Sequence, residues 1–595
     1  MKQYTWRKKF LCLLCAFSLA LPTTGCKQVE NTVKKVETIS VDKKEEQKKF
    51  NKFLKKLFVK EVQSDSITLN YTLSKPEDYG IKDYKPTLGK YGTDVSKEER
   101  VFAENIYEQL NSFCYNALSE EQQKTYDILA DYYKTDKDDE QFLLYGEALG
   151  KTTGIQAQLP ILLSEYNFYD KDDISDYLEL LACVPDYFSQ IEDYEKEKSK
   201  AGLFMSDKNA DNIISQCQDF IDDPENNYLL DVFNDRIDKF EGLSDKERDT
   251  FKNQNKKAVL ESVIPSYEHL IKTLKKLKGT GKNDGGVCNF KNGKTYYEKL
   301  AQSITGSSKN IKEMKQALSQ TKNNALLKIS TLTKNDPDVS NDYFNKKFPL
   351  TDPEKIISDL QNKIKDDFPE LEPVNCDIKY VHKSLEDHLS PAFYLTPPID
   401  NYKENSIYIN RGNNANLDEI YPTLAHEGYP GHLFQNVYFN QQNPTPIRSL
   451  LNYGGYSEGW ATYCELYSYQ FSGLEDNTAE FGKQYNIFTL CLYAEMDIGV
   501  NYDGWTLDKL STFLSSYGVT DKDAAQEVYD IVVDDPANYL QYVIGYIEFA
   551  ELRTKAENTL KKSFSPKAFH TFLLDMGPAP FSVIGDYMEK WMDEQ

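Results

Sequence analysis

The chain has 595 residues, of which 28% are charged and 40% are hydrophobic, and its formal net charge at pH 7 is −24. This acidic balance argues against nucleic acid as a partner, because no basic patch stands out against the excess of Asp and Glu. It also argues against adhesion to anionic lipid beyond a covalent anchor. The length supplies ample hydrophobic core for a globular protein of one or several domains.

The first 26 residues are typical of a bacterial lipoprotein signal peptide. A basic start precedes the apolar stretch Phe10–Leu21, which is too short to span a bilayer comfortably. The segment ends in Leu-Pro-Thr-Thr-Gly-Cys, so we expect Cys26 to become the lipid-bearing N-terminus. The alternative is an ordinary secretory signal with an incidental cysteine. Residues 27–50 are charged and are predicted to form a tether. We therefore expect an exported protein that the lipid anchor alone attaches to the bacterial cell membrane.

Most of the remaining chain carries apolar residues at the three- and four-residue spacing that is typical of amphipathic helices. Helices are predicted over Glu98–Phe113, Ser175–Ser199, Ala210–Phe233 and Lys309–Thr331, and a further helix is predicted to begin at Asp352–Pro353 and run to about Phe368. The Gly-rich segment Lys276–Gly286 is predicted to be a surface loop. It divides an N-terminal helical region, 51–290, from a C-terminal region, 291–595, within one integrated fold.

Three short runs in the C-terminal region favour β-structure. They are Cys376–Val381, Ala392–Leu395 and Ser406–Asn410, separated by proline and polar turns. We expect them to form a small sheet just before the helix that carries His426. Ser406–Asn410 is a candidate edge strand for pairing with an extended substrate, which makes Tyr408 and Asn410 candidate substrate-binding residues. A plain packing strand is an equally good interpretation of the pattern.

The segment Thr423–Gln435 combines His426, Glu427 and His432 in a chain that has only six histidines. Two neutral imidazoles and a carboxylate are a common ligand set for catalytic zinc, which leaves one position open for water. Histidines six residues apart lie about 120° out of alignment on a regular helix. Pro430 and Gly431 between them break that regularity, so we expect a bulge that turns His432 back toward His426.

The third metal ligand is expected to be a carboxylate from a separate helix. Glu458 and Glu465 are seven residues apart, nearly two helical turns, and so face the same side. We assign Glu458 to the metal and Glu465 to the support of a ligand. These residues predict one Zn²⁺ per chain, although the residue types also suit another divalent metal.

The motifs resemble the signature blocks of the bacterial family DUF885, a domain of unknown function that is grouped with the gluzincin metallopeptidases. The matching blocks are His426–Gln435, Glu458–Glu465, Ser390–Tyr394, Ile407–Asn410, Gln541–Gly545 with Leu552–Arg553, and Phe569–His570 with Gly577–Pro580. The resemblance implies a mainly helical, two-lobed body with a deep channel. It also implies that His426, His432 and Glu458 bind zinc and that Glu427 is the base. Asn501 departs from the family, because this position often holds histidine.

These patterns predict an exported, lipid-anchored zinc metallopeptidase that hydrolyses short peptides, with region 291–595 as its catalytic part. Glu427 would take the proton of the zinc-activated water. Tyr542 and Tyr546 are candidates for stabilising the oxyanion, with core packing as their alternative role. Arg553 and His570 are further candidates for substrate binding. The competing functions are a lipoprotein that binds peptide or metal without turnover, and a zinc hydrolase of other amides or esters. The sequence does not indicate the oligomeric state.

Overall fold

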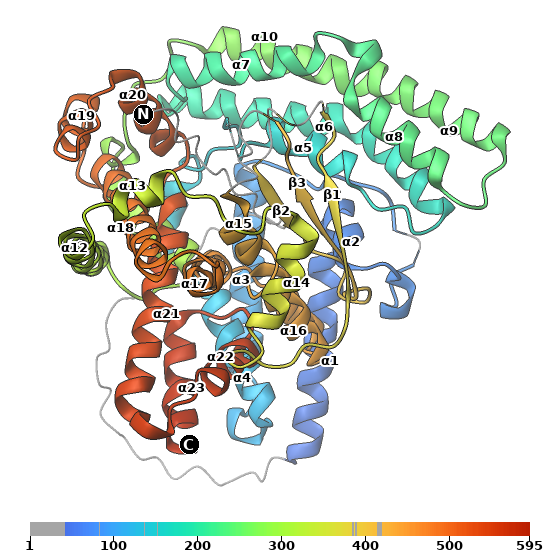
Figure 1. Cartoon of the computed structure of the whole chain (residues 1–595). Helices are drawn as coiled ribbons and strands as arrows, with labels where there is room; N and C mark the ends of the chain where they lie inside the picture. Colours follow the sequence, from blue (N-terminus) through green and yellow to red (C-terminus); the bar gives the residue numbers. More distant parts are fainter. Residues whose placement is uncertain are drawn as a thin grey trace.

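The structure is a computed structural model that describes residues 42–595, except 83, 136, 152, 384–385, 387–389 and 413–418. The signal peptide, Cys26 and the first part of the predicted tether lie outside the described residues. The fold is mainly α with one small sheet, as predicted (Figure 1). In the described part of the chain, no helix is both long and apolar enough to cross a membrane.

The first half of the chain forms helices whose apolar faces point into the body. They are α1 (Lys43–Val62), α2 (Ser66–Thr72), α3 (Thr93–Asn111), α4 (Glu120–Tyr132), α5 (Ile155–Ser164), α6 (Lys171–Ala201), α7 (Asp207–Ile221), α8 (Tyr228–Lys239), α9 (Asp245–Ala258) and α10 (Ile264–Leu277). The predicted single helix over Ala210–Phe233 is two helices, because Pro224 interrupts it between α7 and α8. α1 takes up the last residues of the predicted tether.

The second half contains the strands and the remaining helices. They are α11 (Gly293–Thr305), α12 (Ile311–Asn335), α13 (Val339–Phe344), α14 (Pro353–Lys363), β1 (Asn375–Tyr380), β2 (Ala392–Leu395), β3 (Glu404–Ile409), α15 (Ile420–Glu427), α16 (His432–Gln441), α17 (Gly454–Ser468), α18 (Asp476–Asn501), α19 (Leu507–Ser515), α20 (Lys522–Asp534), α21 (Asn538–Leu560), α22 (Pro566–Met576) and α23 (Phe581–Asp593). α14 begins as predicted, with the Asp352 carboxylate accepting a hydrogen bond from the Lys355 amide at 3.1 Å, but it ends before Phe368.

The described residues form several hydrophobic cores, of which the largest joins helices from both predicted regions. Helices α5–α10 build a core of their own, and Figure 1 shows α6–α10 lying across one end of the molecule. Phe50 of α1, Leu110 of α3 and Leu129 of α4 instead belong to the large core that surrounds α15, α16 and α17. Helices α1, α3 and α4 are therefore packed into the same body as the C-terminal region.

The sheet has the strand order β1-β3-β2, with β1 parallel and β2 antiparallel to β3. All three predicted strands are found within one or two residues of their predicted bounds. The prediction that Ser406–Asn410 is an edge strand is wrong, because β3 is central and both sides of its backbone are paired. β1 and β2 are the two edge strands, and β2 contacts α15.

Candidate metal centre

His426 and His432 approach each other because the helix that carries them is broken between them. α15 ends at Glu427, Tyr429–Pro430 is a cis peptide bond, and α16 begins at His432. The Gly431 amide still donates to the Ala425 carbonyl at 3.0 Å, which folds the break tightly onto α15. The two imidazole ring centroids lie 4.8 Å apart. The predicted bulge is confirmed.

Glycine is required at the turn into α16. A Cβ atom at Gly431 would overlap the carbonyl oxygen of His426 and crowd the carbonyl oxygen of Ala425. At the other side of the break, a Cβ at Gly428 would lie 2.7 Å from the Ile357 side chain and 2.8 Å from the Leu424 carbonyl oxygen. Larger residues at either position would push the two histidine-bearing helices apart.

Two side chains of α17 hold the break from the opposite side. The Trp460 indole Nε1 donates to the carbonyl oxygen of Pro430 at 2.9 Å, and the Cys464 thiol contacts the same oxygen at 3.4 Å. Trp460 and Cys464 are fully buried. The tryptophan of the Glu-Gly-Trp motif therefore has a structural task that the sequence analysis did not assign: it fixes the carbonyl two residues before His432.

Trp460→Phe keeps the ring and removes the indole donor. We expect the metal affinity to fall by about 10-fold, because losses of outer contacts that orient metal ligands commonly cost 10- to 100-fold. Competition titration with a chromogenic chelator measures this affinity. Trp591→Phe, in α23, is the matched control and should leave the affinity unchanged. Equal affinity in Trp460→Phe and the wild type would contradict the assigned role.

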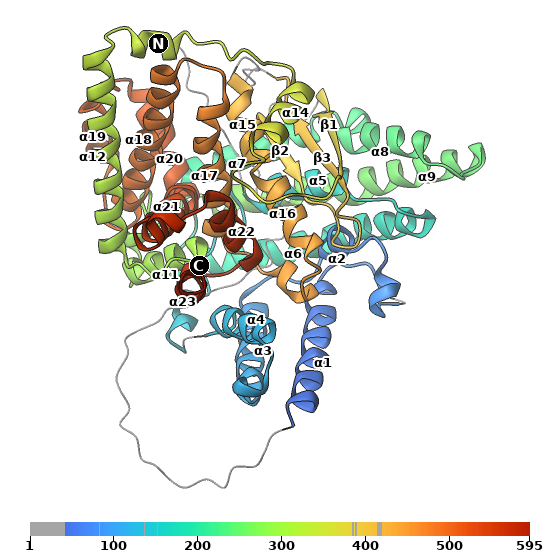
Figure 2. The ribbon, with the colours of Figure 1, turned by 60° about the horizontal axis from the view of Figure 1, so that its bottom comes forward.

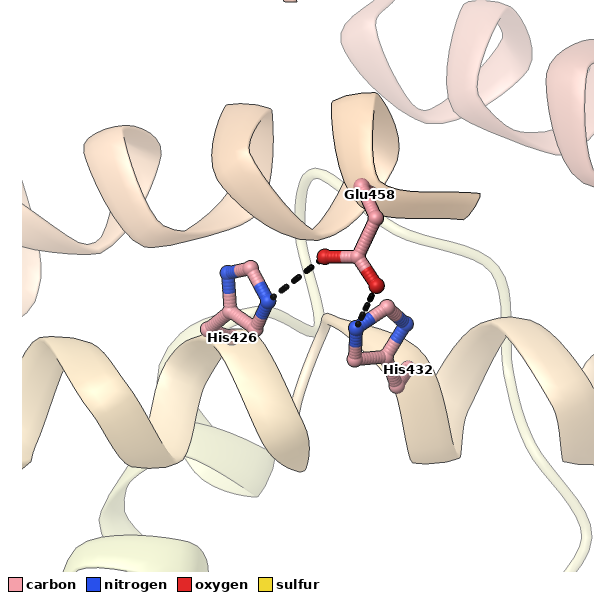
Figure 3. A group of neighbouring side chains, drawn as sticks. All are labelled: His426, His432 and Glu458. Atoms are coloured by element: carbon pink, nitrogen blue, oxygen red, sulfur yellow. Dashed lines mark ion pairs between the residues drawn. The ribbon is translucent and has the colours of Figure 1, made fainter. Parts of the chain in front are cut away.

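Glu458 of α17 lies between the two histidines (Figure 3). Its Oε2 is 3.5 Å from His426 Nε2, and its Oε1 is 3.6 Å from His432 Nε2. One ligand atom from each of the three residues lies within 4.8 Å of the others. Three separate stretches, α15, α16 and α17, thus supply one convergent group. The structure brings together the three residues predicted to bind the metal.

The chemistry of this group fits a divalent cation. Glu458 is buried, and in the described structure its Oε2 accepts no hydrogen bond. Burial alone would raise the pKa of Glu458, but the neighbouring His432 and His426 outweigh it and hold the pKa below its usual value. A buried carboxylate held charged beside two imidazoles is a ligand set that zinc commonly takes in proteins. The identity of the ion is not fixed by these residues.

Glu465, which was predicted to support a metal ligand, lies beside His426. Its Oε2 lies 3.2 Å from His426 Nδ1, on the side of the ring away from Glu458. A carboxylate at Nδ1 fixes the orientation of the ring and favours the tautomer whose Nε2 lone pair can bind a metal. Glu458 and Glu465 therefore act on the two nitrogens of one imidazole.

Glu427 is buried next to the ligand group. Its Oε1 is 4.0 Å from His426 Nε2, and its Oε2 accepts a hydrogen bond from the Tyr394 amide at 3.0 Å. That amide lies in β2, in the sheet predicted to stand beside this helix. The contact between Tyr394 and Glu427 was not predicted. Its only sequence signal was the position of Ser390–Tyr394 among the family blocks.

The two candidate tyrosines lie in different electrostatic surroundings. Burial raises the pKa of Tyr542 well above the usual value, and the negative charges of Glu458 and Glu427 raise it further. For Tyr546, burial raises the pKa, and the smaller contributions come from Cys491, Glu480 and Arg553 and not from Glu458 or Glu427. The role of either tyrosine as an oxyanion donor stays a prediction.

Glycines bring α21, with Tyr542, against α17. A Cβ at Gly459 would overlap the backbone of Gly545, and one at Gly545 would overlap the carbonyl oxygen of Gly455. The two helices touch backbone to backbone at this crossing. The spacing Gly455-x-x-x-Gly459, which overlaps the start of the block Glu458–Glu465, is the sequence feature that permits the close approach.

Tyr408 and Asn410 are engaged within the protein. The Tyr408 hydroxyl donates to Glu165 Oε2 at 2.7 Å, and its ring stacks on Phe393. Asn410 is buried and donates to the Glu386 carbonyl at 2.7 Å. Tyr408 thus contacts the end of α5, while Asn410 shapes the loop after β3. Their role in substrate binding stays a prediction.

Arg553 and His570 are not brought to the ligand group. Both bind the hydroxyl of Tyr463, at 2.6 Å from Arg553 Nη1 and 2.9 Å from His570 Nε2. Tyr463 lies five residues after Glu458, about 140° around α17, and points away from the metal ligands. His570 is fully buried, and burial lowers its pKa to about 3. Its other nitrogen meets the Asp367 carbonyl at 2.6 Å, so substrate has no access to it.

Other residues considered from the sequence have structural roles. Asn501 is buried, and its side chain bonds Asp497, the Val532 carbonyl and the Val287 amide. Arg448 is buried and donates to the Met576 and Pro578 carbonyls. His269 is at the surface and pairs with Glu192. His382 follows β1, and His388 lies outside the described residues.

Comparison with known proteins establishes the family. The chain belongs to the family DUF885, "Bacterial protein of unknown function", whose model matches residues 77–588. A "putative lipoprotein" from Colwellia psychrerythraea is 17% identical with a TM-score of 0.78, covering 92% of this chain and 100% of its own. A "putative lipoprotein of unknown function" from Shewanella oneidensis is 16% identical with a TM-score of 0.59, covering 91% and 99%. These likenesses show the fold.

A third structure, a "putative oligoendopeptidase F" from Bacillus anthracis str. Ames, is 12% identical and covers 87% of this chain and 98% of its own. Its TM-score of 0.31 is too low to support an argument. The search of curated proteins found no match to this chain. The function must therefore be argued from the site itself.

Proposed function

We propose that this protein is an exported, lipid-anchored metallopeptidase that hydrolyses short peptides with one zinc ion. The observation that carries the proposal is the convergence of His426, His432 and Glu458 with Glu427 directly beside them. A site that only stores metal does not need a buried glutamate next to a ligand but outside the ligand set. The likeness to two structures described as lipoproteins supports the anchor.

Each residue of the site has a task in the proposed reaction. When bound, zinc would polarise the scissile carbonyl and lower the pKa of a water molecule. Glu427 takes the proton of that water and passes it to the leaving amine. The Tyr394 amide holds one oxygen of Glu427, which leaves the other directed toward the ligand group. Tyr542 donates a hydrogen bond to the oxyanion.

The outer side of β2 is the place for an extended peptide. β2 is an edge strand, and the Tyr394 amide at this edge reaches Glu427. A peptide that pairs with β2 would therefore pass the proposed base. This assignment replaces β3, whose backbone is paired on both sides. A site that binds peptides in extended form would accept short, unfolded substrates in preference to folded proteins.

The first test is bound metal in the chain 27–595, purified without chelator and measured by elemental mass spectrometry. We expect about one zinc per chain in the wild type and none in His426→Ala. His269→Ala is the matched control, because that histidine lies at the surface and pairs with Glu192. A wild-type protein that neither contains zinc nor takes it up when folded would refute the proposal. A screen of peptides against simple amides and esters then defines the substrate class.

A further inference from the structure

The outer face of α1 is strongly basic, although the protein as a whole is acidic. The helix carries eight lysines in 20 residues, compared with 70 lysines and arginines in all 595 residues. All eight are exposed: Lys43, Lys44, Lys48, Lys49, Lys52, Lys55, Lys56 and Lys60. We call this surface the lysine face.

The opposite side of α1 is buried and fixes the direction in which the lysine face points. Phe50 packs edge-on against Phe113 with ring centroids 5.0 Å apart, and Leu54 and Leu57 lie in the same core. The apolar residues recur at three and four positions, so they form one stripe. The lysines lie on the rest of the helix surface and face solvent. Because the helix is packed against the core, the positions of their backbone atoms are fixed relative to the body.

The acidic residues of α1 scarcely neutralise this face. Glu46 is buried and accepts a hydrogen bond from the Cys114 amide at 2.8 Å, and Glu61 accepts one from the Tyr133 hydroxyl at 2.7 Å. Only Glu45 is exposed. In the described structure, Lys49 alone among the eight lysines reaches a carboxylate, that of Glu46 at 3.7 Å. The positive charge of α1 is thus directed outward.

α1 is also the part of the described fold that lies nearest in sequence to the predicted anchor, since it begins 17 residues after Cys26. Figures 1 and 2 both show α1 at the margin of the body, far from α8 and α9. We propose that the lysine face docks the body on the anionic phospholipid headgroups of the membrane to which Cys26 attaches it. The inference rests on the proposed lipoprotein and adds a second, electrostatic contact to the lipid.

The net charge of −24 does not oppose this contact. At physiological ionic strength, charges farther than a Debye length of about 8 Å are largely screened, so the membrane responds to the nearest face. A helix of 20 residues is about 30 Å long and spans several headgroups. The expectation that lipid alone holds the protein is therefore revised. Docking through α1 would also fix the orientation of the protein relative to the membrane surface.

The test uses the chain 27–595, which keeps every described residue and carries no acyl group. We expect it to sediment with vesicles that contain roughly one third phosphatidylglycerol and not with pure phosphatidylcholine. High salt should release it. Replacing Lys48, Lys52, Lys55 and Lys56 with glutamine should lower the partition coefficient by roughly 100-fold or more, because each lysine near an anionic surface contributes a factor of about five.

The control is Lys246, Lys272, Lys275 and Lys276→Gln, which removes the same charge from α9 and α10. It should bind vesicles as the wild type does, and thermal unfolding should confirm that both variants fold. Equal losses in the two variants, binding to soluble polyphosphate but not to vesicles, or no vesicle binding by the wild type would each overturn the proposal. Fatty-acid labelling of the full chain and of Cys26→Ser tests the anchor separately, so the two failures are distinguishable.

Discussion

Replacing Glu427 with glutamine should lower kcat for peptide hydrolysis by about 1,000-fold and leave zinc bound. The reason is that general bases of this kind contribute roughly 100- to 10,000-fold, and an amide cannot take the proton of the water. Glutamine has nearly the same shape and can still accept the Tyr394 amide hydrogen bond, so the site should keep its geometry. His426, His432 and Glu458 are untouched, which is why the metal should remain.

The measurement is steady-state hydrolysis of a peptide identified in the substrate screen, together with zinc content of the same sample. Glu475→Gln is the matched control, because Glu475 is exposed and its side chain does not cap α18. Activity at the wild-type level in Glu427→Gln would remove the base from the mechanism. Full biological function without turnover would instead favour the competing role as a binding lipoprotein.

The convergence of His426, His432 and Glu458 could be predicted because the information is local. Pro430 and Gly431 do not favour a regular helix. Their presence between His426 and His432 therefore predicts the break that brings the two imidazoles close together. Glu458 and Glu465 follow from the helical repeat of α17. In each case the residues that decide the geometry lie within a few positions of the ligands.

Roles that depend on tertiary packing could not be predicted in the same way. Tyr542 and Tyr546 are one turn apart on α21, and only tertiary packing decides that Glu458 and Glu427 raise the pKa of Tyr542 and not that of Tyr546. His570 appeared in a family block, yet its contacts with Asp367 and Tyr463 make it part of the core. A motif marks a residue as notable without telling whether it touches substrate or supports the fold.

The sheet shows the same limit. Its three strands were predicted correctly, because alternating and β-branched residues mark strands locally. The order of the strands in the sheet was not predicted, because the sequence pattern of a strand does not indicate whether it is central or at an edge. The pairing edge was therefore predicted at β3, whereas the observed pairing puts β3 in the centre of the sheet.

Gly431→Ala should abolish most metal binding, with a fall in zinc affinity of at least about 100-fold. The added Cβ would overlap the His426 carbonyl oxygen, so the backbone must move where one ligand helix ends and the next begins. That movement separates His426 from His432, whose ring centroids lie 4.8 Å apart. Overpacking of this kind also costs about 1–3 kcal/mol of unfolding free energy. Zinc titration and thermal unfolding of the metal-free protein measure the two effects.

Gly585→Ala separates a general effect of removing glycine from the specific one. Gly585 lies in α23, and a Cβ there would meet no atom within 4 Å. Alanine in a helix is favoured over glycine by about 1 kcal/mol, so this variant should be as stable as the wild type or slightly more, with unchanged zinc affinity. If Gly431→Ala also bound zinc like the wild type, the break between α15 and α16 would not be what positions His432. The convergence of the two imidazoles would then need another cause, with the contacts of Trp460 and Cys464 to the Pro430 carbonyl as the remaining constraint.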